Sequence, residues 1–187
     1  LVVCGTTGEN PTISREDKLK LFSAIAKECG HKGSIIANVG SNDTAGSVSL
    51  VKEVSTIPGI DGLLVVVPYY NKPNQQGQYL HFKAIAEATT LPIMVYNVPG
   101  RVGTGIFPNT LARLHKEYPH ICAIKEASGN LMIASEIKRL LPDPSFMLYS
   151  GDDGLALPIL SVGGCGVVSV VAHVAGTDIN AMIQAFE

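Results

Sequence analysis

Apolar, mostly β-branched runs alternate with amphipathic segments along the whole chain. The apolar runs are typical of buried strands and cover residues 1–5, 34–40, 62–70, 92–99, 121–127, 146–151 and 166–173. Between them, helical apolar spacing is found in residues 14–30, 77–90 and 131–142. We therefore expect about seven strands, each with a following helix.

The helical segments also carry start and stop signals. Ser14 is expected to cap the first segment, and the side chain of Asp17, three residues later, to contact Ser14 in return. Gly30 is expected to end this helix. In the last segment the buried stripe is expected to consist of Ile133, Ile137, Leu140 and Leu141, before Pro142.

The spacing of the units indicates parallel strands with helical crossovers. From Leu63 to Pro92 is 29 residues, and from Pro92 to Ile121 is again 29. A (β/α)8 barrel and a doubly wound open sheet both fit. The open sheet would carry G-x-G-x-x-G after its first strand, whereas this chain has "GTTGE". We therefore favour an α/β fold of the (β/α)8 TIM-barrel type.

The ends of the chain bear on this expectation. The sequence opens inside an apolar run without an initiating Met and closes on a helical pattern without a stop signal. A barrel needs eight strands and about 250 residues. We therefore expect residues 1–187 to be one partial barrel domain, strands 2 to 8, lacking the first strand–helix unit.

Composition excludes several classes of function. The chain is 46% hydrophobic and 16% charged, with a net charge of −2 and no basic run that would indicate nucleic-acid binding. No apolar stretch reaches the ~18 residues of a membrane span. The four cysteines lie far apart, which argues against zinc or disulfide frameworks and predicts buried, reduced thiols in a cytoplasmic protein.

Polar residues gather where the expected strands end, which is the catalytic rim of a barrel. Alternate strand residues share a face, so Ile121, Ala123 and Lys125 would point inward together. Burial can lower the pKa of a lysine by about 3–5 units. The neutral amine is then a nucleophile that forms a Schiff base with a carbonyl. Aldol chemistry would follow without a metal or cofactor.

Structural explanations remain open for each of these residues. Lys125 could instead pair with a carboxylate, and Tyr96, Tyr70 and Thr6 could serve packing rather than a proton relay. Arg101 could bind a carboxylate or be a solvated loop residue. Two weaker signals, "GDDG" as a metal or acid–base site and "VGGCGVV" as a phosphate site, are better explained as a helix cap and a loop.

At these residues the chain resembles the dihydrodipicolinate synthase/N-acetylneuraminate lyase group of class I aldolases. The resemblance spans essentially all 187 residues and is carried by "GTTGE", "PYYNKP", "YNVPGR", "IKEASGN", "SGDD" and "GVVSV", in family order. It implies a (β/α)8 barrel in which Lys125 forms a Schiff base with pyruvate. Tyr96 would be the central hydroxyl that carries protons to and from pyruvate, and Thr6 and Tyr70 would complete the relay. Tyr70 would reach across a dimer interface into the neighbouring subunit's site.

The same resemblance assigns residues that bind substrates. Thr7 matches the residue that holds the pyruvate carboxylate, and Arg101 the one that binds the carboxylate of aspartate semialdehyde. Gly151 and Val168 match positions that line the pocket through their backbone. The resemblance also suggests a homo-oligomer built as a dimer of dimers. On composition we expect no nucleic-acid or membrane partner, and on the Schiff-base chemistry no cofactor or metal.

Arg101 discriminates within the family, because the sialic acid lyases and several sugar-acid aldolases generally lack an arginine there. The resemblance therefore implies the synthase branch, an early step of diaminopimelate and lysine synthesis. A related 2-keto-acid aldolase, a non-catalytic keto-acid-binding barrel, and a metal- or phosphate-dependent barrel enzyme are the alternatives.

Two departures from the family pattern are visible. The family's first strand–helix unit and its C-terminal helical extension are absent here. The missing strand would pair with residues 1–5 and with the strand around 167–171, so two parallel edges would be exposed. A protein of only these 187 residues is therefore not expected to be soluble and active. In the lysine feedback site of some members, histidines and a carboxylate hold the ligand. The matching residues here are Arg15, Lys18 and Gly46, so lysine is not expected to inhibit.

Overall fold

Seven parallel strands form one sheet in the computed structural model, which describes residues 1–186. The strands are β1 Val2–Val3, β2 Ile36–Asn38, β3 Gly62–Val66, β4 Ile93–Asn97, β5 Ile121–Glu126, β6 Met147–Ser150 and β7 Gly166–Val167. They neighbour one another in chain order. This confirms the expected strand number and direction. A doubly wound sheet would instead reverse its order at a switch point.

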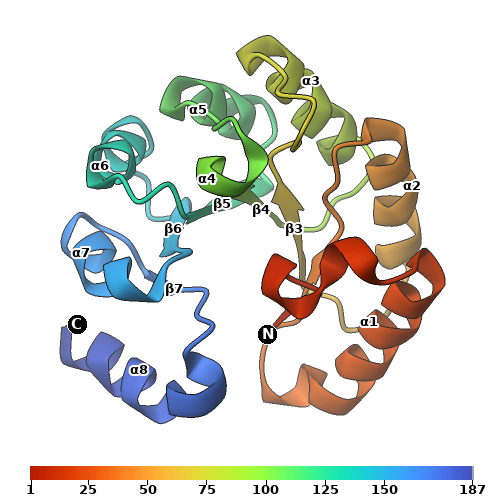
Figure 1. Cartoon of the computed structure of the whole chain (residues 1–187), viewed down its shortest axis with the longest axis horizontal. Helices are drawn as coiled ribbons and strands as arrows, with labels where there is room; N and C mark the ends of the chain where they lie inside the picture. Colours follow the sequence, from red (N-terminus) through yellow and green to blue (C-terminus); the bar gives the residue numbers. More distant parts are fainter. Residues whose placement is uncertain (187) are drawn as a thin grey trace.

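Helices cover the outer face of the curled sheet (Figure 1). They are α1 Arg15–Cys29, α2 Thr44–Val54, α3 Gln75–Ala86, α4 Pro99–Val102, α5 Pro108–Glu117, α6 Leu131–Leu140, α7 Ala156–Ser161 and α8 Ala172–Phe186. Short 3-10 turns are η1 Thr6–Gly8, η2 Asn10–Thr12, η3 Gly30–Lys32 and η4 Asp153–Leu155. Strands β1 and β7 are the two edges of the sheet, and the ring of strands is open between them (Figure 1).

The first helix begins and ends where its signals predict. The Ser14 hydroxyl accepts a hydrogen bond from the Asp17 amide and donates one to the Asp17 carboxylate, as in a capping box. Gly30 follows the last residue of α1, in right-handed rather than left-handed backbone. Ile137 in α6 and Leu141 directly after it are buried as expected, while Ile133 and Leu140 are only partly buried.

Strands β3 and β4 lie in the centre of the core. Every residue of both strands is buried, as expected for parallel strands covered on both faces. The covering helices and the segment before β6 contribute large side chains that are almost completely buried, among them Phe22, Phe82 and Phe146. Burial of these aromatic and aliphatic side chains supplies most of the stabilising free energy of the fold.

The strand expected over residues 166–173 is much shorter than predicted. The strand β7 ends at Val167, and α8 begins at Ala172. Asp153, in the turn after β6, accepts hydrogen bonds from the backbone amides of Val170 and Val171. The Ser169 hydroxyl accepts one from the amide of Ala172. These contacts occupy the amides that a longer strand would need for pairing, so the extended prediction was wrong.

The four cysteine side chains differ in their burial. All four cysteines are free thiols, but only Cys4 is buried; Cys29 and Cys122 are partly buried, and Cys165 is exposed, so the expectation of four buried thiols was wrong. Within residues 1–186, no helix combines the length and the apolar character that crossing a membrane requires.

Candidate active site

Lys125 lies near the end of β5, directly opposite Tyr96 on β4 in the sheet register. The Lys125 side chain is only 8% exposed and Tyr96 only 5%. The Lys125 Nζ lies 4.3 Å from the centroid of the Tyr96 ring. Paired residues of neighbouring strands point to the same face, so the sheet itself holds the amine against the phenol ring.

The surroundings of this pair change both pKa values. Burial lowers the pKa of the Lys125 amine, the positive charge of Arg101 lowers it further, and the negative charge of Asp153 acts in the opposite direction. Burial raises the pKa of the Tyr96 phenol, while Arg101 and the nearby Thr6 hydroxyl oppose the rise. The amine is thus biased toward its neutral, nucleophilic form, and the phenol toward its proton-donating form.

The carboxylate next to Lys125 in sequence points elsewhere. Glu126 is buried and accepts hydrogen bonds from the Asn97 side-chain amide and from the backbone amide of Ser128. Among residues 1–186, no carboxylate lies within salt-bridge distance of the Lys125 amine. The structural explanation of Lys125 as half of an ion pair therefore finds no support in the described part of the chain.

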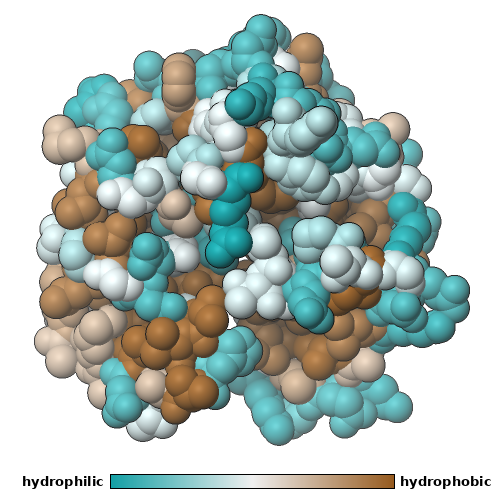
Figure 2. Space-filling model, in the orientation of Figure 1, coloured by the Kyte–Doolittle hydropathy of each residue, from teal (hydrophilic) through white to brown (hydrophobic). Residues whose placement is uncertain are grey.

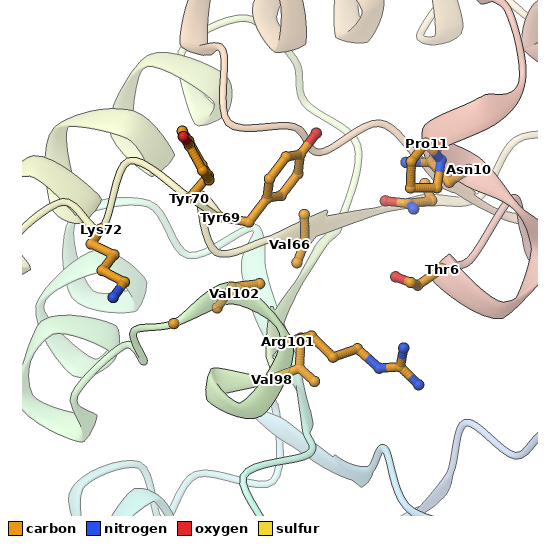
Figure 3. A pocket seen from close by; sticks show the side chains of 12 residues that line it. Thr6, Asn10, Pro11, Val66, Tyr69, Tyr70, Lys72, Val98, Arg101 and Val102 are labelled. Atoms are coloured by element: carbon orange, nitrogen blue, oxygen red, sulfur yellow. The ribbon is translucent and has the colours of Figure 1, made fainter.

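A cavity of about 720 Å³ opens beside this pair. Of the predicted site residues, Thr6, Tyr70 and Arg101 line it (Figure 3). Lys125 and Tyr96 do not line it, but they lie close enough to Arg101 for its charge to lower the pKa of Lys125 further and to oppose the rise in the pKa of Tyr96. In Figure 3 the Arg101 side chain extends toward the side of the cavity on which Thr6 lies. The cavity is large enough for a small-molecule ligand.

Residues with strained backbone conformations lie around the same cavity. Four residues other than glycine have positive φ within residues 1–186: Cys4, Glu9, Tyr70 and Lys72, at 56°, 61°, 68° and 46°. Tyr70 and Lys72 line the cavity, and the other two flank the η1 turn, which contains Thr6. Such conformations cost about 1–3 kcal/mol each and cluster at ligand-binding sites.

The remaining predicted residues lie at the ends of β1, β6 and β7. Thr7 is exposed in η1 beside Thr6. Gly151 follows β6, and a Cβ atom there would lie 2.7 Å from the Cβ atom of Ala127 and 3.0 Å from the Cε and Cγ atoms of Lys125, so a larger residue would crowd both side chains. Val168 follows β7, where its backbone amide donates to the carbonyl oxygen of Ser150.

Several residues at the cavity were not predicted from the sequence. Asn10, Asn38 and Lys72 line it, and Asp153 influences the pKa of Lys125 from the β6–α7 turn. Asn38 had a visible signal, because a lone amide in the apolar run 34–40 has to find polar partners when it is buried. Lys72 and Asn10 lie in loops, whose course depends on the tertiary structure.

Known proteins match this chain along its whole length. The sequence profile of the dihydrodipicolinate synthetase family matches residues 1–187. The 4-hydroxy-tetrahydrodipicolinate synthase of Desulforamulus reducens is 52% identical over 186 residues, which are 100% of this chain and 62% of that protein. The synthase of the same name from Listeria monocytogenes is 50% identical over 189 residues and is covered to 63%. The chain thus spans somewhat less than two thirds of these relatives.

Solved structures that resemble this chain come from the same family. The lysine-bound crystal structure of DHDPS from Cyanidioschyzon merolae superposes with a TM-score of 0.96 at 46% identity, over 99% of this chain and 62% of that one. Dihydrodipicolinate synthase from Bacillus anthracis gives a TM-score of 0.95, also at 46% identity, over 99% of this chain and 62% of that one. On the match along its whole length, the chain belongs to the dihydrodipicolinate synthetase family.

Proposed function

We propose that the protein is a 4-hydroxy-tetrahydrodipicolinate synthase, a lyase that condenses pyruvate with aspartate 4-semialdehyde early in diaminopimelate and lysine biosynthesis. The observation that carries this proposal is the buried Lys125 amine, held opposite Tyr96 and without a carboxylate partner among residues 1–186. The names of the relatives at about 50% identity support the same reaction.

The chemistry starts at the neutral Lys125 amine. It attacks the keto carbon of pyruvate, and loss of water gives a Schiff base. The protonated imine withdraws electrons, so the methyl carbon of pyruvate loses a proton and becomes the nucleophile that attacks the aldehyde of the second substrate. The amino group of that substrate, once deprotonated, then attacks the imine carbon, which closes the ring and releases the Lys125 amine. Tyr96, with its raised pKa, would deliver and collect the protons of these steps, helped by Thr6 and Tyr70.

Arg101, at the cavity, would bind the carboxylate of aspartate semialdehyde, because its guanidinium can donate two parallel hydrogen bonds. Thr7 would hold the carboxylate of pyruvate, and Gly151 and Val168 would line the pocket through their backbone. Tyr70 supports an assembly in which it reaches a second subunit, because it lines the cavity yet is 89% exposed. We propose a dimer of dimers, located in the cytoplasm.

The fold proposal is that this curled sheet represents strands 2 to 8 of a (β/α)8 barrel, lacking the first strand–helix unit and a C-terminal helical extension. The sequential parallel order and the helices on the outer face support it. In this arrangement, residues 1–187 form a single domain and Lys125 lies at the carboxyl ends of the strands, where barrel enzymes place their active sites.

Borohydride reduction in the presence of pyruvate tests the proposal. The intact protein is expected to carry a reduced pyruvyl adduct on the peptide containing Lys125, detected by mass spectrometry. Lys125→Arg keeps the charge but cannot form the imine, so its adduct should be lost. Lys72→Arg is the matched control, because Lys72 lines the neighbouring cavity, and it should retain the adduct.

The other outcomes point to other functions. Reversible pyruvate binding without an adduct would contradict the proposal and indicate a non-catalytic binding protein. An adduct with turnover of sugar acids, but not of aspartate semialdehyde, would indicate a related keto-acid aldolase such as N-acetylneuraminate lyase. Loss of activity on chelation would indicate metal-dependent chemistry.

A further inference from the structure

Two asparagines in the wall of the large cavity have side-chain oxygens without hydrogen-bond donors. Asn10 is 8% exposed and Asn38 is 1% exposed, and both line the cavity. Within residues 1–186, the Oδ1 atom of each accepts no hydrogen bond. A buried carbonyl-type oxygen without a donor costs free energy, so two such atoms in one cavity wall point to a ligand that donates hydrogen bonds.

The orientation of Asn38 follows from its one partner. Its Nδ2 atom donates to the backbone carbonyl of Cys4 at 2.7 Å. Only the amino group of an amide can donate, so the Oδ1 atom has to point away from Cys4. The Oδ1 atom of Asn10 has no hydrogen-bond partner among residues 1–186, so no protein donor competes with a ligand for it.

The charges of the lining residues indicate which kind of hydrogen-bond donor a ligand would carry. The residues that line it include the cations Arg101 and Lys72 but no aspartate or glutamate. A carboxylate acceptor here would pair with these cations. A neutral amide oxygen can accept from an ammonium group without forming that competing ion pair. The wall is therefore suited to a ligand that carries a carboxylate together with an amino group.

We propose that Asn10 and Asn38 determine specificity for the second substrate by accepting hydrogen bonds from its α-ammonium group. This inference rests on the proposed function. Pyruvate has no N–H donor, whereas aspartate semialdehyde carries an ammonium group with three. Each oxygen exposes almost no surface, so each contact requires a small side-chain movement or one bridging water.

The placement of the two groups is compatible with one substrate molecule. Figure 3 shows Asn10 and Thr6 on the side of the cavity toward which the Arg101 side chain extends. The carboxylate on Arg101 and the ammonium on the asparagine wall would together orient the aldehyde carbon. Orientation by two remote groups is an efficient way to lower the barrier of a bond-forming step.

Two ligands that differ only in the amino group test this inference in the intact protein. For Asn10→Ala and Asn38→Ala, the KM of aspartate semialdehyde should rise about tenfold, since each loses an acceptor for a charged donor. The inhibition constant of succinate semialdehyde, which lacks the amino group, should change less than about twofold. Asn10→Gln retains a neutral amide oxygen and should keep the preference for the amino compound.

Asn42→Ala serves as the control, because Asn42 bonds to Asn71 and does not line the cavity. Equal losses for both ligands would overturn the inference and show that the asparagines only support the η1 turn. Unchanged values for both would also overturn it. If wild-type protein forms the pyruvyl adduct but does not turn over aspartate semialdehyde, the proposed function itself fails.

Discussion

Lys125 is the residue on which the proposed chemistry depends, and its environment comes from three other elements. Tyr96 lies beside it through the β4–β5 register, Arg101 follows β4, and Asp153 follows β6. The apolar run around Lys125 and the alternation of strand residues identified the amine from the sequence. The opposing influences of Arg101 and Asp153 on its pKa required the structure.

The pH dependence of adduct formation tests these two charges. The fraction of neutral amine rises as the pH passes upward through the pKa of Lys125. Arg101 lowers that pKa, so Arg101→Gln should shift the acid limb of adduct formation to higher pH. Asp153 raises it, so Asp153→Asn should shift the limb to lower pH.

The measurement is the rate of borohydride-trapped adduct with pyruvate alone, so that binding of the second substrate does not interfere. Glu136→Gln is a suitable control, because Glu136 pairs with Arg139 on the surface of α6. Shifts of both test variants in the same direction would contradict the electrostatic explanation.

At the level of elements, local signals predicted α1 well and β7 poorly. The capping box at Ser14 depends on residues three positions apart, which a sequence pattern can reveal. The end of β7 depends on Asp153, which is distant in the chain from the amides it binds. The β-branched run around residues 167–171 is compatible with a strand, and only this tertiary contact ends it.

Helices α1 and α2 also border a second cavity of about 190 Å³, lined in part by Arg15, Lys18 and Gly46. Glu53 pairs with Arg15 at 2.6 Å, and Lys18 has no salt-bridge partner among residues 1–186. Lys18 repels an ammonium group, and the residues that line this cavity include neither a carboxylate nor an asparagine side chain that could accept its hydrogen bonds. Lysine is therefore expected not to inhibit the intact enzyme, measured as residual activity against lysine concentration. Half-inhibition well below millimolar lysine would contradict this.

At the level of the whole molecule, the two edges of the sheet have the largest effect on the expected tendency to aggregate. Strands β1 and β7 each have one neighbour among residues 1–186. Near β7, apolar side chains are exposed, including Val170, Val171 and Val174, the last to 91%. Figure 2 shows apolar surface over the region of α7 and α8. Unpaired edges and exposed apolar surface together favour aggregation.

A protein consisting of residues 1–187 alone is therefore expected to be aggregation-prone and inactive. Size-exclusion chromatography and the pyruvate-trapping assay would measure this, with a full-length relative such as the Listeria monocytogenes synthase as the reference. A monodisperse preparation that forms the adduct would contradict the expectation.

The periodicity of apolar residues was enough to establish seven parallel strands with helices between them, because strand and helix periods depend on local geometry. The strand ends likewise identified Lys125, Tyr96 and Arg101 as neighbours, since the carboxyl ends of parallel strands meet at one edge. Tertiary packing alone decided where β7 stops, which charges act on the amine, and that Asn10 and Asn38 share a cavity wall. Those features arise from contacts between loops and side chains that lie far apart in the chain. A local sequence pattern contains no information about such contacts.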